Sequence, residues 1–317
     1  MIVFGPVPSR RLGKSLGINN IPFKYCSYSC AYCQLGSTKN FIIERRKFYK
    51  VDEIFAEVQA KVTEVQQSGE TIDYLTFVPD GEPTLDENLG IEIEMLRTLM
   101  IPIAVITNSS LLSLESVIQN LAMADLVSVK IDTVNEQIFH RLDRPHPKLN
   151  LNSILEGVRL FSERYKGKLI TETMLVKGIN DSPELISETA RFIREVDPKE
   201  SYISIPIRPP QDRSIAVPDA ERLVEAYQLF TKYLQNVSLL SEAEVGSFSS
   251  TGDIANDILS IISVHPMREE KVVELIKNRG ESFAIVETLI KNSKINRVDY
   301  NDQVFYIRNF VSGGKHE

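Results

Sequence analysis

Residues Cys26-Ser-Tyr-Ser-Cys30-Ala-Tyr-Cys33 contain all three cysteines of the 317-residue chain, and the predicted fold is organised around this segment. The spacing is Cys-x3-Cys-x2-Cys. Three thiolates from one short loop can each bind a different iron of a cubane [4Fe-4S] cluster, while the fourth iron keeps no protein ligand. Because three cysteines in one segment also make a poor disulfide framework, the segment predicts a cluster site on Cys26, Cys30 and Cys33.

A structural zinc site is the main alternative for these thiols. Such a site normally has four protein ligands, so a histidine would have to complete it. None of the four histidines lies beside the cysteines in the sequence; they are His140, His146, His265 and His316. The sequence therefore favours a cluster over a zinc site, and also over three free buried thiols.

Short apolar runs rich in β-branched residues alternate with amphipathic segments along most of the chain. The runs predict strands at residues 16–21, 74–78, 101–107, 126–131, 169–176 and 202–207. Continuous apolar strands separated by helices are typical of a parallel sheet in an α/β fold. Six βα units are too few to close an eight-stranded barrel, so the prediction is a partial (β/α)6 barrel with its functional residues at the carboxyl ends of the strands.

The composition changes at residues 246–252, where the sequence GSFSSTG predicts a linker. The expected domains are therefore a barrel over 1–245 and a smaller domain over 246–317. Helical patterns at 254–264, 269–277 and 282–291, followed by two strands joined through Asn301-Asp302, predict a winged helix. Its nine lysines and arginines are balanced by ten acids. Since duplex binding normally needs a basic surface, a docking or packing role is favoured over DNA binding.

The cysteine spacing, the aromatic Tyr32 before the third cysteine and the order of the βα units resemble the radical S-adenosylmethionine (SAM) superfamily. The resemblance implies that SAM binds the open iron and is cleaved to a 5′-deoxyadenosyl radical, which abstracts hydrogen from a substrate. The segment Asp80-Gly-Glu-Pro-Thr84 strengthens it. Superfamily members carry a Gly-Gly-Glu-Pro-like segment there, which holds the SAM amino group through backbone carbonyls and the acid. Asp80 replaces the first glycine.

Other segments resemble a group of Fe–S oxidoreductases near the wyosine-base synthases and the glycyl-radical activating enzymes. They are 5–13, 178–181 and 208–210, and the resemblance covers residues 1–245. Three cysteines suffice for one cluster, so we expect no auxiliary cluster and no methyl-carrying cysteine. The resemblance also implies an electron donor such as flavodoxin or ferredoxin.

Several residues near the strand ends are candidate SAM contacts: Tyr32, Asp80, Gly81, Glu82, Pro83, Asn108, Lys130 and Asp132. Simpler roles compete with this prediction. Glu82 and the segment at Asn108 could cap helices. Lys130 and Asp132, two residues apart on one strand face, could form a structural ion pair.

The charge distribution predicts an anionic substrate. The first fifty residues contain nine lysines and arginines and one acid, although the whole chain has a net charge of −7. Guanidinium groups bind phosphate and carboxylate groups well. Four arginines are therefore candidate substrate contacts: Arg10, Arg11, Arg208 and Arg213. Arginines that only decorate surface loops are the alternative.

These observations favour a radical SAM enzyme acting on an anionic small-molecule, protein or RNA substrate. An RNA- or tRNA-modifying radical enzyme is the first alternative. A non-catalytic Fe–S redox regulator acting through the winged helix is the second. The sequence has no apolar run of about 18 residues and no secretory signal, so we expect a cytoplasmic protein without a membrane partner.

Overall fold

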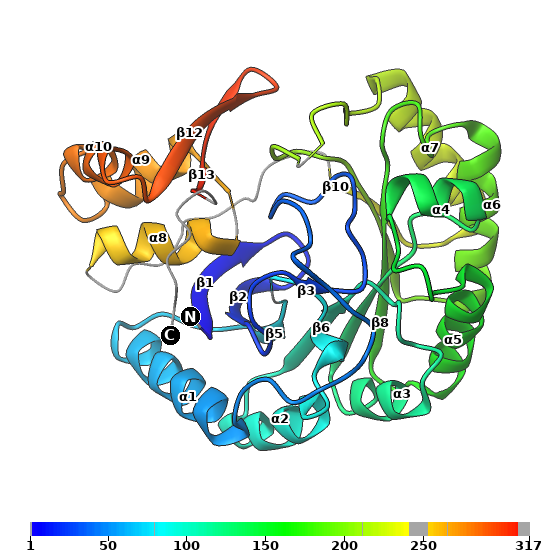
Figure 1. Ribbon diagram of the computed structural model, residues 1–317, viewed down its shortest axis with the longest axis horizontal. Helices are drawn as coiled ribbons and strands as arrows, with labels where there is room; N and C mark the ends of the chain where they lie inside the picture. The colour runs from blue at the N-terminus through cyan, green and yellow to red at the C-terminus, as the bar shows by residue number, and fades with distance from the viewer. Residues whose placement is uncertain (1, 79, 211, 241–252, 265, 310–317) are drawn as a thin grey trace.

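A computed structural model describes residues 2–78, 80–210, 212–240, 253–264 and 266–309 (Figure 1). Its largest element is an open, curved sheet of eight strands in the order β1-β2-β5-β6-β7-β8-β9-β10. Within it, β1 runs antiparallel to β2, and all the other neighbouring strands are parallel. The strands are β1 (Val3–Ser9), β2 (Gly13–Ile18), β5 (Tyr74–Phe77), β6 (Ile103–Thr107), β7 (Leu126–Lys130), β8 (Lys168–Met174), β9 (Glu200–Ser204) and β10 (Val237–Leu240).

The six predicted strands correspond to β2 and β5 to β9, and the sheet is an open half-barrel. The sequence did not predict the two edge strands, β1 and β10. β1 contains a glycine and two prolines, which are uncommon in strands away from sheet edges. β10 has only four residues, of which Leu240 alone is buried, so its apolar signal is weak.

The outside of the curved sheet is covered by α1 (Val51–Gln67), α2 (Leu89–Leu96), α3 (Glu115–Leu121), α5 (Leu151–Arg164), α6 (Pro183–Val196) and α7 (Ala220–Tyr233) (Figure 1). Helix α4 (Glu136–Leu142) packs instead against residues 28–31. Short 3-10 turns occur at η1 (Pro83–Leu85) and η2 (Arg97–Leu99). The helices are amphipathic because each buries one apolar stripe, which in α1 consists of Ile54, Val58, Val62 and Val65.

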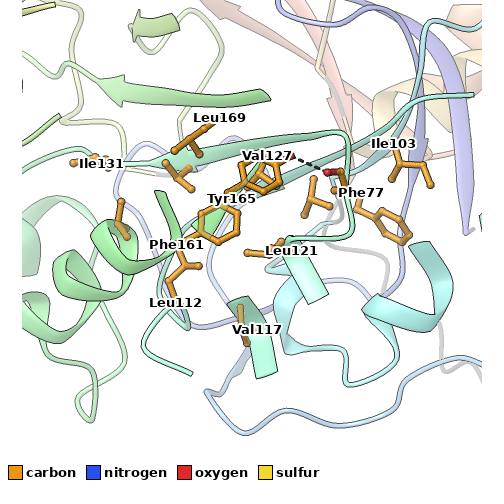
Figure 2. Packing of buried hydrophobic residues seen from close by; sticks show 14 of the residues in the cluster. Phe77, Ile103, Leu112, Val117, Leu121, Val127, Ile131, Phe161, Tyr165 and Leu169 are labelled. Atoms are coloured by element: carbon orange, nitrogen blue, oxygen red, sulfur yellow. Dashed lines mark hydrogen bonds between the residues drawn. The ribbon is translucent and has the colours of Figure 1, made fainter. Parts of the chain in front are cut away.

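The main core fills the space between the sheet and these helices (Figure 2). Val127 of β7 faces Phe161 and Tyr165 at the end of α5, and the two rings stack with centroids 4.8 Å apart. The Tyr165 hydroxyl donates to the Ala124 carbonyl at 2.9 Å, so its polar atom is satisfied inside the core. Each fully buried side chain of this size contributes about 1.5–3 kcal/mol to stability.

The carboxyl-terminal part has its own small core. It contains α8 (Ile254–Val264), β11 (Met267–Arg268), α9 (Glu269–Lys277), α10 (Ala284–Lys291), β12 (Ile295–Tyr300) and β13 (Gln303–Arg308). The three strands pair in the order β11-β13-β12. Asn301 and Asp302 both have positive φ angles, as the tight turn between β12 and β13 requires. The predicted linker at 246–252 lies outside the described residues.

Helix α8 packs against β1, so the carboxyl-terminal part adjoins the antiparallel edge of the half-barrel (Figure 1). Val7 of β1 contacts the carboxyl-terminal core directly. Among the described helices, none combines the length and the apolar character needed to cross a bilayer.

Candidate functional site

A cavity of about 390 Å³ lies at the carboxyl ends of the parallel strands. Its walls come from β1 and the turn after it, from the cysteine loop (residues 26–33), from the ends of β7 and β8, and from the segments that follow β5, β6 and β9. This is the end of a parallel sheet at which α/β folds place their functional groups. The cavity therefore collects side chains from segments that are far apart in the sequence.

The cysteine loop forms one wall, and all three thiols line the cavity. The end of α4 holds this loop in place. The Ala31 amide donates to the Leu142 carbonyl at 2.8 Å, and the Ser29 amide donates to the Asp143 carbonyl at 3.2 Å. The ring of Tyr28 contacts Phe139 of α4 edge-on, with centroids 5.5 Å apart. The loop is thus positioned by a helix more than a hundred residues away.

Each cysteine sulfur has a different polar neighbour. The Asn108 amide lies 3.6 Å from the Cys26 sulfur, and the Lys24 ammonium lies 3.2 Å from the Cys33 sulfur. The Cys30 thiol donates to the Asp143 carboxyl over 3.8 Å. Burial raises the pKa of the Cys26 thiol to about 12 and also raises that of Cys30. A bound cation would favour the thiolates, because metal ligation requires the deprotonated form.

The donor set fits an iron–sulfur cubane better than a single ion. Within the part of the chain that the structure describes, no three His, Cys, Asp or Glu side chains gather closely enough to hold one metal ion. In a cubane each thiolate binds a different iron, so the ligands are spread around the cluster. Three cysteines along one wall of a large cavity meet that requirement.

The segment after β5, residues 80–84, contacts the chain just before the cysteine loop. A Cβ atom added to Gly81 would lie 1.8 Å from the Tyr25 carbonyl oxygen, so only glycine fits there. The same carbonyl accepts from the Glu82 amide at 3.1 Å. Close approach of two backbones, rather than an unusual φ angle, therefore explains the glycine.

Glu82 joins the ends of β5 and β6. Its Oε1 accepts from the Thr84 amide, the Thr84 hydroxyl and the Thr107 hydroxyl, at 3.1, 2.6 and 2.6 Å. Its Oε2 accepts from the Asn108 amide at 2.7 Å. The side chain is 1% exposed, and burial raises its pKa although the hydrogen bonds oppose the shift. Glu82 also caps η1, as the capping alternative predicted.

Lys130 and Asp132 form an ion pair of 3.9 Å, and only Lys130 lines the cavity. The Lys130 ammonium also lies 3.6 Å from Glu172 and 4.8 Å from the centre of the Tyr32 ring. Asp132 is 5% exposed and accepts from the Tyr32 hydroxyl at 2.5 Å and from the Met174 amide at 2.7 Å. Asp132 thus supports the wall from behind, while Tyr32 and Lys130 form its surface.

Three of the four predicted arginines reach the cavity. Arg10 and Arg11 line it from the turn after β1, and Arg208 lines it from the segment after β9. Arg213 is exposed and lies outside the cavity wall. The neighbouring Asp212 carboxylate accepts from Arg144 and from the Ser214 hydroxyl.

The charge of Arg11 is already matched inside the protein. Its guanidinium pairs with Glu172 of β8, which also accepts from the Ser204 hydroxyl at 2.9 Å. Arg208 donates to the Gln34 amide oxygen at 2.9 Å, which links the segment after β9 to the cysteine loop. The positive charge around the cavity is therefore smaller than the sequence count suggests.

Other predicted residues divide between the cavity and its support. Asp80, Gly81, Glu82 and Asn108 line the cavity, whereas Pro83 is buried in η1 outside the wall. Lys24 and Asp143 lie beside cysteine sulfurs and Gln34 lines the cavity, but none of the three was predicted from the sequence. Lys24 lies two residues before the first cysteine, which could have identified it. Asp143 lies in no recognisable pattern, and only the fold brings it to the cysteine loop.

The chain is similar in sequence to known proteins. A family model described as the Radical SAM superfamily matches residues 20–193. A UPF0026 protein of Methanocaldococcus jannaschii is 47% identical over 316 residues, covering 99% of this chain and 98% of the relative. A UPF0026 protein of Helicobacter pylori is 31% identical over 309 residues, covering 96% and 97%.

A solved structure shares the fold at low sequence identity. Streptococcus suis SuiB bound to S-adenosylmethionine is 16% identical and has a TM-score of 0.52, covering 78% of this chain and 56% of that chain.

The Glu82 contacts predict a structural role that can be measured. Replacing Glu82 by Gln exchanges one carboxylate oxygen for an amide nitrogen, which cannot accept the hydrogen bonds that Thr84, Thr107 and Asn108 donate. We expect the free energy of unfolding to fall by about 1–3 kcal/mol, because a buried donor loses its acceptor. Urea denaturation of the cluster-free protein measures this. Glu94→Gln, at an exposed position of α2, is the control and should change stability by less than about 0.5 kcal/mol. Equal stability of the two variants would contradict the role.

Proposed function

The chain belongs to the radical SAM superfamily, and on this premise we propose that it uses a single [4Fe-4S] cluster to generate a radical that abstracts hydrogen from an anionic substrate. Membership makes it a radical SAM enzyme whose cofactors are a [4Fe-4S] cluster and SAM. The observation that carries the proposal is the placement of Cys26, Cys30 and Cys33 on one cavity wall. No other cysteine exists in the chain to hold a second cluster.

In this proposal the three thiolates would hold the cluster, and the cysteine loop with the ends of β5, β6 and β7 would hold SAM. When both are bound, the cluster would supply the electron that cleaves SAM to methionine and the 5′-deoxyadenosyl radical. Tyr32, Asp80, Gly81, Asn108 and Lys130 are the proposed SAM contacts on the cavity wall. Glu82 also lines the cavity and ties the ends of β5 and β6 together, while Pro83 and Asp132 support the wall from behind. An electron donor such as flavodoxin or ferredoxin would reduce the cluster.

We also propose that Arg10 and Arg208 recognise the anionic group of the substrate. Arg10 follows the edge strand β1, and Arg208 follows β9, which lies next to the other edge strand, β10. Both arginines line the cavity, so they reach it from near the two opposite edges of the sheet. Arg11 contributes less net charge, because Glu172 pairs with it. The substrate class remains open among small molecules, proteins and RNA. Membership of an enzyme superfamily argues against the non-catalytic regulator.

For the carboxyl-terminal part, we propose a winged-helix domain over 246–317 that packs on a barrel domain over 1–245. Three contacts favour packing over nucleic-acid binding. The Tyr300 hydroxyl donates to the Pro206 carbonyl at 2.8 Å, and Pro206 lines the cavity. The Arg308 guanidinium lies 4.9 Å from the Phe23 ring centre, just before the cysteine loop. Val7 of β1 packs against the carboxyl-terminal core. The β12–β13 hairpin thus contacts two segments that border the cavity.

Single replacement of Cys26, Cys30 or Cys33 by Ala should abolish 5′-deoxyadenosine formation and leave the circular dichroism spectrum unchanged, because each thiolate is needed for the cluster but not for the barrel core. The unaltered protein, reconstituted anaerobically, should hold about four irons and four sulfides per chain. Ser37→Ala, at an exposed position four residues after Cys33, is the control and should keep full activity. An iron content near eight would mean a second cluster, and SAM cleavage by a cysteine variant would reject the assignment.

Replacing Arg10 or Arg208 by Gln should impair the response to substrate but spare SAM cleavage in its absence. The measurement is the stimulation of 5′-deoxyadenosine formation by the anionic fraction of a cell extract. Loss of one charge-assisted hydrogen bond, about 1.5–3 kcal/mol, should raise the concentration needed by roughly 10- to 100-fold. Arg213→Gln, outside the cavity, should respond as the unaltered protein does. Equal responses from all three variants would remove the basis for an anionic substrate.

Tyr300→Phe removes only the hydroxyl that holds the Pro206 carbonyl. Without this hydrogen bond, worth about 1 kcal/mol, amide hydrogen exchange in residues 204–208 should become roughly fivefold faster. Tyr227→Phe, on the exposed face of α7, is the control and should leave exchange there unchanged. If both variants exchange at the same rate, the hairpin does not stabilise this cavity segment.

A further inference from the structure

Lys24 has a buried ammonium group two residues before the first cysteine. The residue is 3% exposed and lines the cavity. Its Nζ lies 3.2 Å from the Cys33 sulfur, and none of the ion pairs between described residues includes it. Burying a positive charge is unfavourable unless a negative charge lies next to it. The Cys33 sulfur, once it is a thiolate, is the negative charge with which Lys24 pairs.

The backbone holds Lys24 in this position in an unfavourable conformation. Its φ angle is 61°, in the left-handed region that favours glycine. The Lys24 amide donates to the Asp80 carbonyl at 3.0 Å, and the Lys24 carbonyl accepts from the Asn40 amide at 3.0 Å. These bonds attach the residue to the segment after β5 and to β4 (Asn40–Phe41), which pairs with β3 (Tyr25–Cys26). Glycine would meet these backbone requirements more easily, so they do not account for a lysine side chain here.

The other two cysteine sulfurs have neighbours of a different kind. Cys26 lies beside the neutral Asn108 amide, and Cys30 lies beside the Asp143 carboxyl. Of these three polar neighbours, Lys24 alone carries a positive charge. Local charge and hydrogen bonds to the sulfurs are the main means by which a protein sets the potential of an iron–sulfur cluster. Because reduction adds an electron to a site that already has three thiolates, a nearby positive charge stabilises the reduced form more than the oxidised form.

We propose that the Lys24 ammonium raises the reduction potential of the cluster through its contact with Cys33, so that the electron donor reduces the cluster more easily. This inference rests on the proposed function, since it takes the three cysteines as the ligands of a single cluster. The step is a one-electron reduction in which the donor protein loses the electron that the cluster gains, and no covalent bond changes. Lys24 therefore acts on the cluster through a ligand and does not take part in the chemistry on the substrate.

Potentiometric titration of the anaerobically reconstituted protein, followed by electron paramagnetic resonance in the absence of SAM, tests the assignment. Lys24→Met removes the charge and keeps an unbranched side chain, whereas Lys24→Gln keeps an N–H donor without the charge. Both variants should hold as much iron as the unaltered protein and be reduced at a more negative potential. We expect the equilibrium constant for reduction to fall about tenfold, which corresponds to about 59 mV for a one-electron couple. Lys24→Arg should keep the potential of the unaltered protein, because it keeps the charge.

Lys39→Met is the matched control, because Lys39 is exposed and its ammonium lies 5.6 Å from the centre of the Phe23 ring. This variant loses the same charge from the same part of the chain and should keep the potential of the unaltered protein. Equal potentials for Lys24→Met and Lys39→Met would overturn the proposal, since the buried charge would then have no effect on the cluster. Loss of iron from both neutral Lys24 variants would also overturn it, in favour of a role in holding the cluster. The iron content of the unaltered protein tests the proposed function separately.

Discussion

The contact between the cysteine loop and the end of β5 is the constraint on which the rest of the site depends. The Tyr25 carbonyl sits so close to Gly81 that no side chain fits between them, and it accepts the amide of Glu82. Glu82 in turn ties this segment to Thr107 and Asn108 at the end of β6. The Asn108 side chain then reaches back to the Cys26 sulfur and to Ser27. One closed set of contacts therefore aligns the cysteine loop with the strand ends.

Because this set is closed, each member has little freedom to take another role. Glu82 is the clearest case, because its two carboxylate oxygens accept hydrogen bonds from three residues of the protein. The charged side chains near β8 are also paired within the protein. Glu172 holds Arg11 and lies near Lys130, so the cavity combines many charged groups with a modest net charge.

The carboxyl-terminal part extends this arrangement beyond the barrel. Its hairpin contacts Pro206 on one side of the cavity and Phe23 before the cysteine loop on the other. A half-barrel has unpaired edges that need cover, and a packed domain next to β1 can supply it. These contacts support the packing role that we propose for the carboxyl-terminal part.

Local sequence determined the parts of this protein that depend on spacing and periodicity. The cysteine spacing indicated the cluster, and the apolar runs indicated the six inner strands, because a buried parallel strand needs a continuous apolar run. The two edge strands lack that run, so the sequence pattern did not predict β1 and β10. It also did not predict the pairing of Arg11 with Glu172 or the position of Asp143 beside Cys30. They join residues more than a hundred positions apart, and only the curvature of the sheet and the packing of its helices decide which charges meet.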